Sequence, residues 1–198
     1  MTEKIFYIMG KSASGKDSIY AALKDDEQLN LNHILLYTTR PIRNHEKDGV
    51  DYFFIDEEKV QQFQQEGKII EMRSYNTVHG VWRYLTVDDG QFRQNGAGSL
   101  MIGTLESYEK MKQYFGADVL VPIYIEVEDG VRLERALQRE KMQKYPKYSE
   151  LCRRYLADEQ DFCKENLDAA GISFSFHNDK FQYCVEQIRE YIRKKIFQ

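Results

Sequence analysis

The loop formed by residues 10–16 constrains the fold of this chain more than any other segment. Its sequence is Gly-Lys-Ser-Ala-Ser-Gly-Lys, with a lysine directly after the second glycine. It follows a continuous apolar run at residues 5–9, which is typical of a strand buried on both faces of a parallel sheet. A stretch with helical character, residues 16–24, comes next. This context predicts a phosphate-binding loop, and an ordinary turn between a strand and a helix is the alternative.

Each part of the loop suits a nucleoside triphosphate. Glycines let the backbone curl so that successive N–H groups point inward, and the helix that follows adds the positive end of its dipole. The side chain of Lys16 then reaches the β- and γ-phosphates. The residues that we expect to bind ATP in this loop are Gly10, Ser12, Ala13, Ser14, Gly15 and Lys16.

The position after Lys16 is unusual, because Asp17 stands where a serine or threonine normally meets Mg²⁺. A carboxylate suits a hard cation, so Asp17 would ligate Mg²⁺ directly or through water, with Ser18 beside it in the ATP and metal site. Alternatively, its negative charge weakens nucleotide binding. The Gly-Lys-Asp sequence with a following serine resembles loops in some phage deoxynucleotide kinases and in phosphomevalonate kinases, which favours a working loop.

Apolar runs alternate with helical stretches along most of the chain. Further runs lie at residues 34–37, 100–102 and 120–127, and candidate helices lie at 88–95, 106–115 and 129–143. Alternating strands and helices predict an α/β fold, with a parallel sheet flanked by helices as in P-loop proteins. Apolar side chains at 3.6-residue spacing in residues 181–196 predict an amphipathic C-terminal helix.

Residues 40–84 interrupt this alternation. They contain a polar loop at 42–48, short β-like runs at 52–55 and 69–75, and a helical stretch at 57–65. We interpret them as a small α+β subdomain inserted into a single domain of residues 1–198. The expected parts are a core (1–36, 85–138 and 150–198), an acceptor-binding insertion (37–84) and a short charged lid between two helices (139–149).

The composition excludes several classes of protein. Of the 198 residues, 42% are hydrophobic and 30% are charged, which suits a compact domain and not a disordered chain. A net charge of −4 without an obvious basic patch argues against a nucleic-acid partner, and no apolar stretch reaches the roughly 18 residues of a membrane span. Three widely spaced cysteines form no disulfide or zinc pattern. We therefore expect a cytoplasmic protein without membrane or nucleic-acid partners, and its oligomeric state stays open.

A second group of polar residues follows the apolar run at 34–37. Arg40 and Arg43 are three positions apart, so their planar guanidinium groups can converge on one phosphate with bidentate hydrogen bonds. The hydroxyl group of Tyr52 can add a neutral donor. The alternative is a solvated loop rich in charge.

The order of these motifs resembles the guanylate kinase family. Tyr-Thr-Thr-Arg-Pro-Ile-Arg at residues 37–43 is similar to the family's Ser-x-Thr-Thr-Arg-x-Pro-Arg, and Gly-Lys-Ile-Ile-Glu at 67–71 is similar to its Gly-x-Phe-x-Glu. Residues 46–53 resemble part of its Gly-Glu-x-x-Gly-x-Asp-Tyr-x-Phe segment, and His-Asn-Asp at 177–179 resembles the Asn-Asp that borders the adenine of ATP. The likeness is dense in the first 75 residues and patchy afterwards.

The resemblance implies roles at the acceptor site. Arg40, Arg43 and Tyr52 would hold the phosphate of the acceptor nucleotide. Glu71 would accept hydrogen bonds from N1 and N2 of guanine, or else it forms an ion pair at the surface with a residue such as Lys68 or Arg73.

The resemblance also implies roles at the donor site, where Mg-ATP would bind. Asn178 and Asp179 would lie beside the adenine. The family's lid-flanking arginines share one helical face, as Arg132, Arg135 and Arg139 do, and Arg153 and Arg154 take the place of its Arg-Arg-Leu. Those expected to close on the transferred phosphoryl group are Arg135, Arg139 and Arg153, with a solvated helix face as the alternative for each.

Several positions depart from the family near the base. Leu36 replaces a serine, Val81 replaces a serine or threonine that reads the base, and Gly103 lies in a segment that lacks the family's aspartates. His79 replaces a tyrosine that binds phosphate, so it is either a substituted phosphate donor or a surface histidine. The groups that handle phosphate persist while groups near the base change, which makes phosphoryl transfer better supported than guanine specificity.

Three functions follow from these motifs. The first is a guanylate kinase or a close variant that transfers the γ-phosphoryl group of ATP to GMP or dGMP. The second is a P-loop kinase with another monophosphate or a small-molecule acceptor. The third is a non-catalytic module that binds phosphopeptides, but such modules usually lack the loop lysine, and Lys16 is present.

Overall fold

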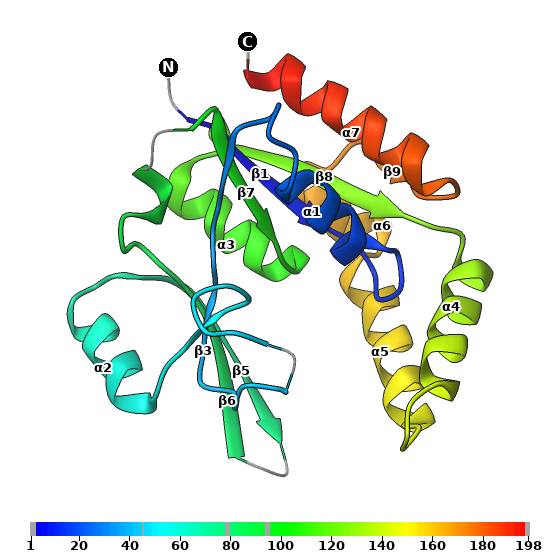
Figure 1. The fold of residues 1–198 in the computed structure, drawn as a ribbon, viewed down its shortest axis with the longest axis horizontal. Helices are drawn as coiled ribbons and strands as arrows, with labels where there is room; N and C mark the ends of the chain where they lie inside the picture. Colours follow the sequence, from blue (N-terminus) through cyan, green and yellow to red (C-terminus); the bar gives the residue numbers. More distant parts are fainter. Residues whose placement is uncertain (1–2, 45, 78–79, 94–95, 197–198) are drawn as a thin grey trace.

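The structure, a computed structural model, describes residues 3–44, 46–77, 80–93 and 96–196. Its larger sheet has five parallel strands in the order β2-β7-β1-β8-β9 (Figure 1). The strands are β1 (Ile5–Met9), β2 (Leu31–His33), β7 (Gly98–Ile102), β8 (Leu120–Glu126) and β9 (Phe176–His177). This arrangement confirms the predicted α/β fold with a parallel sheet.

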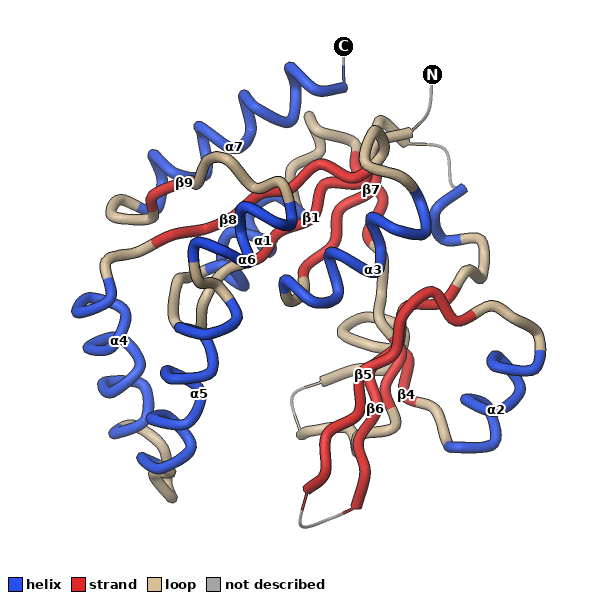
Figure 2. The backbone as a smooth tube through the Cα atoms, turned by 180° about the vertical axis from the view of Figure 1, so that it is seen from behind, coloured by secondary structure: helices blue, strands red, loops and turns tan. Residues whose placement is uncertain are grey.

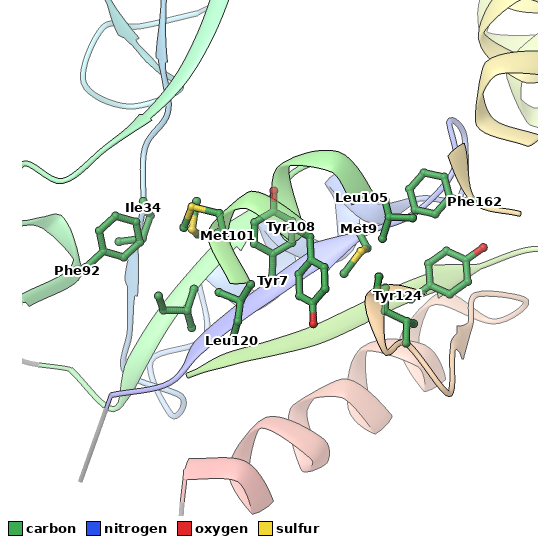
Figure 3. Packing of buried hydrophobic residues seen from close by; sticks show 14 residues of the cluster. Tyr7, Met9, Ile34, Phe92, Met101, Leu105, Tyr108, Leu120, Tyr124 and Phe162 are labelled. Atoms are coloured by element: carbon green, nitrogen blue, oxygen red, sulfur yellow. The ribbon is translucent and has the colours of Figure 1, made fainter. Parts of the chain in front are cut away.

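Helices cover both faces of this sheet. Phe6 and Ile8 of β1 belong to a core with α1 (Lys16–Lys24) and α7 (Phe181–Ile196). Tyr7 and Met9 point to the opposite face and belong to a second core with α3 (Leu105–Phe115) and α6 (Lys164–Ala170). Figure 3 shows them beside Leu105 and Tyr108 of α3. Because side chains alternate along a strand, burial on both faces requires the continuous apolar run that β1 has.

A second, smaller sheet lies apart from the first (Figure 2). Its order is β4-β3-β6-β5, and its strands are β3 (Tyr37–Thr38), β4 (Phe53–Phe54), β5 (Ile69–Thr77) and β6 (Gly80–Val87). Its core contains residues of the sheet and of α2 (Glu57–Gln65): Tyr37, Val60, Phe63, Leu85 and Val87. The helix has the residues that the sequence predicts, and the Asp56 side chain caps it by accepting from the Lys59 N–H.

Two sequence expectations are wrong. Residues 34–37 do not form a strand of the larger sheet, because β2 ends at His33 and β3 belongs to the smaller sheet. Between them, the backbone of Leu35 bonds to the side chain of Gln91 over 2.8 and 3.3 Å. The predicted helix at 88–95 is, among the described residues, only a 3₁₀ turn, η1 (Gln91–Arg93), because the Asp89 carboxylate accepts from the Gln91 N–H and favours a turn.

Two further helices extend from the same edge of the larger sheet as the β5–β6 hairpin (Figures 1 and 2). They are α4 (Asp129–Lys141) and α5 (Tyr148–Asp161), joined by the charged residues 142–147. The carboxyl ends of the central strands therefore lie between the smaller sheet and the α4–α5 pair.

Among the described residues, no helix combines the length and the apolar character needed to cross a membrane.

Candidate active site

The loop between β1 and α1 is packed closely against β8. Ala13 and Gly15 have positive φ angles, 64° and 86°. A side chain at Gly10 would bring its Cβ atom to 2.5 Å from the carbonyl oxygen of Ile125, near the carboxyl end of β8. Glycine at this position therefore lets the loop pass over the end of the parallel sheet, where ligands bind in open α/β folds.

Asn178 holds the loop from the side of β9. Its Nδ2 atom donates to the Ser14 carbonyl over 2.8 Å, and its backbone N–H donates to the Glu126 carbonyl over 2.8 Å. A Cβ atom on Gly15 would lie 2.4 Å from the same Nδ2 atom. Asn178 is buried and has a structural role, while Asp179 is exposed. Their position beside the adenine stays a prediction.

Lys16 and Asp17 begin α1 and differ in exposure. The Lys16 Nζ atom lies 3.6 Å from Oδ2 of Asp17, and the side chains are 20% and 84% exposed. Ser18 is exposed too. An exposed carboxylate at this position suits Mg²⁺, which is bound by one or two carboxylates together with phosphate oxygens and water. The residues fit the ion, and their roles as its ligands stay predictions.

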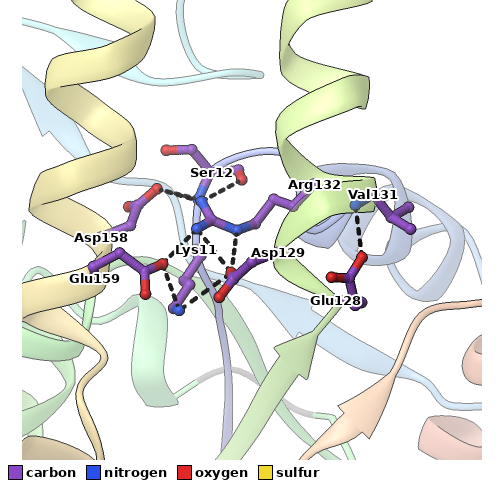
Figure 4. A network of polar contacts seen from close by, with 8 residues as sticks. All are labelled: Lys11, Ser12, Glu128, Asp129, Val131, Arg132, Asp158 and Glu159. Atoms are coloured by element: carbon purple, nitrogen blue, oxygen red, sulfur yellow. Dashed lines mark hydrogen bonds and ion pairs between the residues drawn. The ribbon is translucent and has the colours of Figure 1, made fainter.

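A network of ion pairs, which sequence reasoning missed, connects the loop with α4 and α5 (Figure 4). Its centre is Arg132, whose side chain is 2% exposed. The guanidinium group contacts three carboxylates: Asp129 at 3.0 Å, Asp158 at 3.2 Å and Glu159 at 2.6 Å. Lys11 of the loop adds a contact to Glu159 at 2.7 Å. Only the Asp129–Arg132 spacing, one helical turn, gave a sequence signal for this network.

The same network reaches the backbone of the loop. The Ser12 N–H donates to Asp158 over 2.8 Å, and Arg132 donates to the Ser12 carbonyl over 3.4 Å. The guanidinium of Arg132 also lies 4.3 Å from the ring centre of Tyr155. Arg132 is therefore an internal structural residue and differs from Arg139, which shares its helical face but is exposed.

A cleft of about 590 Å³ lies between the loop, the start of α1, α4, α5 and Arg43. Of the predicted site residues, it brings together Ser12, Asp17, Arg43 and Arg139. Arg154, next to the predicted Arg153, also lines it. Arg135 instead donates to the Asn178 carbonyl over 3.2 Å.

The two arginines of α5 share one carboxylate. Arg153 and Arg154 each donate to Glu150 over 2.8 Å. The hydrogen bonds from Arg153, and then those from Arg154, lower the pKa of Glu150 to about 2. Both arginines stay more than half exposed, so they are accessible to a ligand in the cleft, although the catalytic role of Arg153 stays a prediction.

Arg40, one of the predicted phosphate ligands, is buried in an ion pair. Its Nη1 and Nη2 atoms donate to the two carboxylate oxygens of Glu46 over 2.8 and 2.9 Å. Its Nε atom donates to the Tyr84 hydroxyl over 3.1 Å, and its guanidinium lies 5.4 Å from the ring centre of Tyr52. Most of its donors are therefore in use before any phosphate binds.

Arg43 is better placed for a ligand than Arg40. The side chain of Arg43 is 59% exposed and lines the cleft. Burial raises the pKa of Tyr52, and its neighbour Tyr84 adds to the rise. Its role at the acceptor phosphate stays a prediction. His79, the remaining residue predicted for the acceptor site, lies outside the described residues.

Glu71, the predicted guanine ligand, is completely buried. It accepts from Arg73 Nε over 3.1 Å, from Arg73 Nη2 over 3.3 Å and from the Thr86 hydroxyl over 2.9 Å. The alternative, an ion pair with Arg73, is thus present, but in the interior and not at the surface. Lys68 instead contacts Glu66 at 2.6 Å.

The three positions that differ from the guanylate kinase family, Leu36, Val81 and Gly103, lie in different parts of the structure. Leu36 packs against the core of the larger sheet. Val81 is 44% exposed on the β5–β6 hairpin. At Gly103, a Cβ atom would lie 2.0 Å from the Tyr7 hydroxyl oxygen, so any side chain there would displace Tyr7.

Comparisons with known proteins agree with this architecture. A sequence model of guanylate kinase matches residues 2–82. The guanylate kinase of Mycoplasma pneumoniae is 30% identical over 120 residues, which are 61% of this chain and 49% of that protein. The guanylate kinase of Malacoplasma penetrans is 39% identical over 72 residues, 36% of this chain and 37% of that protein. The chain thus spans about a third to a half of the length of these relatives.

A solved structure matches the whole chain. The crystal structure of guanylate kinase from Anaplasma phagocytophilum has a TM-score of 0.64 and 20% sequence identity, and the match covers 100% of this chain and 88% of the other. At this identity the likeness shows the fold, a parallel sheet with flanking helices and the loop after its first strand.

Proposed function

We propose that this chain, which belongs to the guanylate kinase family, is a cytoplasmic ATP-dependent kinase that phosphorylates a nucleoside monophosphate, with GMP and dGMP as its preferred acceptors. The observation that carries the proposal is the shared cleft. Ser12 and Asp17 at the donor loop and Arg43 at the acceptor segment line the same cavity of about 590 Å³. A phosphoryl group could pass between two nucleotides held there.

Catalysis would come from position and charge, without a covalent intermediate. The loop backbone and Lys16 hold the β- and γ-phosphates, and Arg139 faces the same cleft. Arg135 and Arg153 are the further arginines that we assign to the transferred group. When bound at Asp17 and Ser18, Mg²⁺ would supply additional charge neutralisation at the phosphates.

Acceptor binding would combine phosphate and base contacts. Arg43 and Tyr52 contact the acceptor phosphate, and Arg40 supports them from its buried position against Glu46. Glu71 is the residue assigned to guanine, and its pairing with Arg73 weakens that recognition. Residues 37–84 act as the acceptor-binding insertion and 139–149 as a lid whose closure excludes water.

The test is a coupled assay of ATP with GMP, dGMP, AMP, UMP and CMP. We expect the highest kcat/KM for GMP or dGMP. Lys16→Ala should remove most of the turnover, since losing a charge-stabilising group costs about 3 kcal/mol or more. Lys24→Ala, at the other end of α1, is the matched control and should keep the wild-type rate. Turnover above about a tenth of wild type in Lys16→Ala would refute the P-loop mechanism.

A different monophosphate acceptor is the second candidate, and the buried Glu71–Arg73 pair favours it. Phosphorylation of another member of the panel in preference to GMP would select it. A phosphopeptide-binding module without catalysis would instead show no ATP binding by calorimetry.

A further inference from the structure

Glu71 and Arg73 form an ion pair inside the protein. They are two positions apart on β5, so their side chains share one face of the strand. Oε2 of Glu71 accepts from Nε of Arg73 over 3.1 Å, and Oε1 accepts from Nη2 over 3.3 Å. The side chains are 0% and 8% exposed.

Two threonine hydroxyl groups form further hydrogen bonds with the pair. Thr86, opposite Glu71 on β6, donates to Oε1 over 2.9 Å, and Thr104 accepts from Nη1 of Arg73 over 3.3 Å. A carboxylate has about four lone-pair positions, and three are filled here within the protein. One position remains, so a base could form two hydrogen bonds to Glu71 only after displacing Arg73.

This pair lies where a ligand would be expected. Thr104 follows β7 and caps the start of α3, and β7 is hydrogen-bonded to β1, which leads into the phosphate loop. The carboxyl ends of parallel strands are where α/β proteins bind ligands. Tyr7 fills the adjacent space, because its hydroxyl donates to Ser107 over 2.7 Å and leaves no room for a side chain at Gly103.

We propose that Arg73 determines acceptor specificity by holding the Glu71 carboxylate in this ion pair. The inference rests on the proposed kinase function and on Glu71 as its base-facing carboxylate. A carboxylate that is already neutralised has little preference for the N1–H and N2–H₂ donors of guanine over the edge of another base. The wild-type protein therefore recognises its acceptor mainly through the phosphate.

The test compares the affinities for GMP and AMP, measured by calorimetry at pH 8 on protein shown to be folded by circular dichroism. We expect wild type to prefer GMP by less than about tenfold, whereas a site built for such hydrogen bonds discriminates by about 10⁴. Arg73→Ala leaves Glu71 with the Thr86 hydrogen bond alone. It should raise the preference for GMP at least about tenfold, because hydrogen bonds from matching donors to a buried carboxylate are strong. Arg73→Lys keeps the positive charge without the two-point contact and should shift the ratio in the same direction.

Arg83→Ala is the matched control. Arg83 lies on the neighbouring strand β6 and also pairs with a glutamate, Glu57, at 2.9 Å, but the pair is partly exposed. Its removal should leave the ratio of GMP to AMP affinity at the wild-type value. If Arg73→Ala does not fold, the Arg73→Lys ratio decides.

The outcomes separate this inference from the proposed function. A wild-type preference for GMP above about a hundredfold, lost in Glu71→Gln, would overturn the inference and uphold the kinase, because Glu71 would already serve the base. An unchanged ratio in the folded Arg73 variants would also overturn it. If no monophosphate is phosphorylated, the proposed function fails, and the binding ratios still decide the role of Arg73.

Discussion

The guanidinium group of Arg40 and the carboxylate of Glu46 face each other with two parallel contacts, of 2.8 and 2.9 Å. Their side chains are 3% and 9% exposed. Removing one partner of a buried ion pair costs about 3–5 kcal/mol, and because glutamine keeps one acceptor, Glu46→Gln should lower the free energy of unfolding by about 2–3 kcal/mol. Urea denaturation measures the change. Glu57→Gln, in the partly exposed pair with Arg83, should cost less than about 1 kcal/mol.

The pair also predicts a pH dependence. Hydrogen bonds from Arg40 lower the pKa of Glu46 from 4.5 to about 2 in the folded protein. A group with a lowered folded pKa contributes stability that is complete above its unfolded pKa and is lost as the pH falls through the folded value. The difference in stability between wild type and Glu46→Gln should therefore shrink from pH 4.5 to pH 2. A difference that stays constant over this range would contradict the assignment.

Substitution of Arg43 should reduce kcat/KM for the acceptor while changing the stability of the protein less than substitution of Arg40 does. Its side chain is 59% exposed, and its contact to Glu46 is long, 4.0 Å. Arg43→Lys keeps the charge but loses the planar fork, so kcat/KM for the acceptor should fall about tenfold with an unchanged melting temperature. Arg40→Lys should lower both quantities. Unchanged kinetics in both variants would remove the acceptor-site assignment.

Local patterns explain which parts of the fold could be predicted from the sequence. The bounds of β1, α1 and α2 follow from nearby residues, through apolar runs, glycines and the Asp56 cap. The prediction of a strand at residues 34–37 was wrong because an apolar run does not specify which of two sheets it joins. In this chain it connects the sheets, and Ile34 packs in one core while Tyr37 packs in the other.

In the candidate site, too, contiguous motifs could be predicted from the sequence, whereas contacts between distant residues could not. The loop sequence and its place after β1 could be predicted, because the motif is contiguous. The partners of its charged residues could not, since Lys11 meets Glu159, and Ser12 meets Asp158, across about three-quarters of the chain. Arginine spacing likewise gave no sign that Arg40 is buried against Glu46 while Arg43 is exposed.

Asp17 should govern the magnesium requirement. Its carboxylate is 84% exposed and lines the cleft, so it is free to contact a hard cation. Asp17→Ala should raise the Mg²⁺ concentration for half-maximal activity several-fold, with a smaller effect on the acceptor KM. Asp25→Ala, an exposed aspartate directly after α1, serves as the control. Tighter ATP binding with an unchanged Mg²⁺ dependence would identify Asp17 as a repulsive neighbour of the phosphates.

Arg132 should be the most sensitive arginine for stability. It neutralises Asp129, Asp158 and Glu159 from an interior position, and Arg132→Met keeps much of its volume while leaving these carboxylates to repel each other. The free energy of unfolding should fall by about 3–5 kcal/mol, as for other buried pairs that lose one partner. Arg135→Met is the matched control on the same helix. Arg135 makes a hydrogen bond to the Asn178 carbonyl, so its removal should cost about 1 kcal/mol.

The pH dependence of the stability lost in Arg132→Met tests whether the ion pairs of Arg132 cause that loss. Burial alone would raise the pKa of Asp129, but hydrogen bonds and charges from Arg132 and Lys11 lower it below its ordinary range. The contribution of Asp129 to stability is therefore present at neutral pH and is lost as this carboxylate becomes protonated in acid. The difference between wild type and Arg132→Met should be largest near pH 7 and should narrow below pH 4. Equal stability of the two proteins at pH 7 would show that the network in Figure 4 does not hold the loop against α4 and α5.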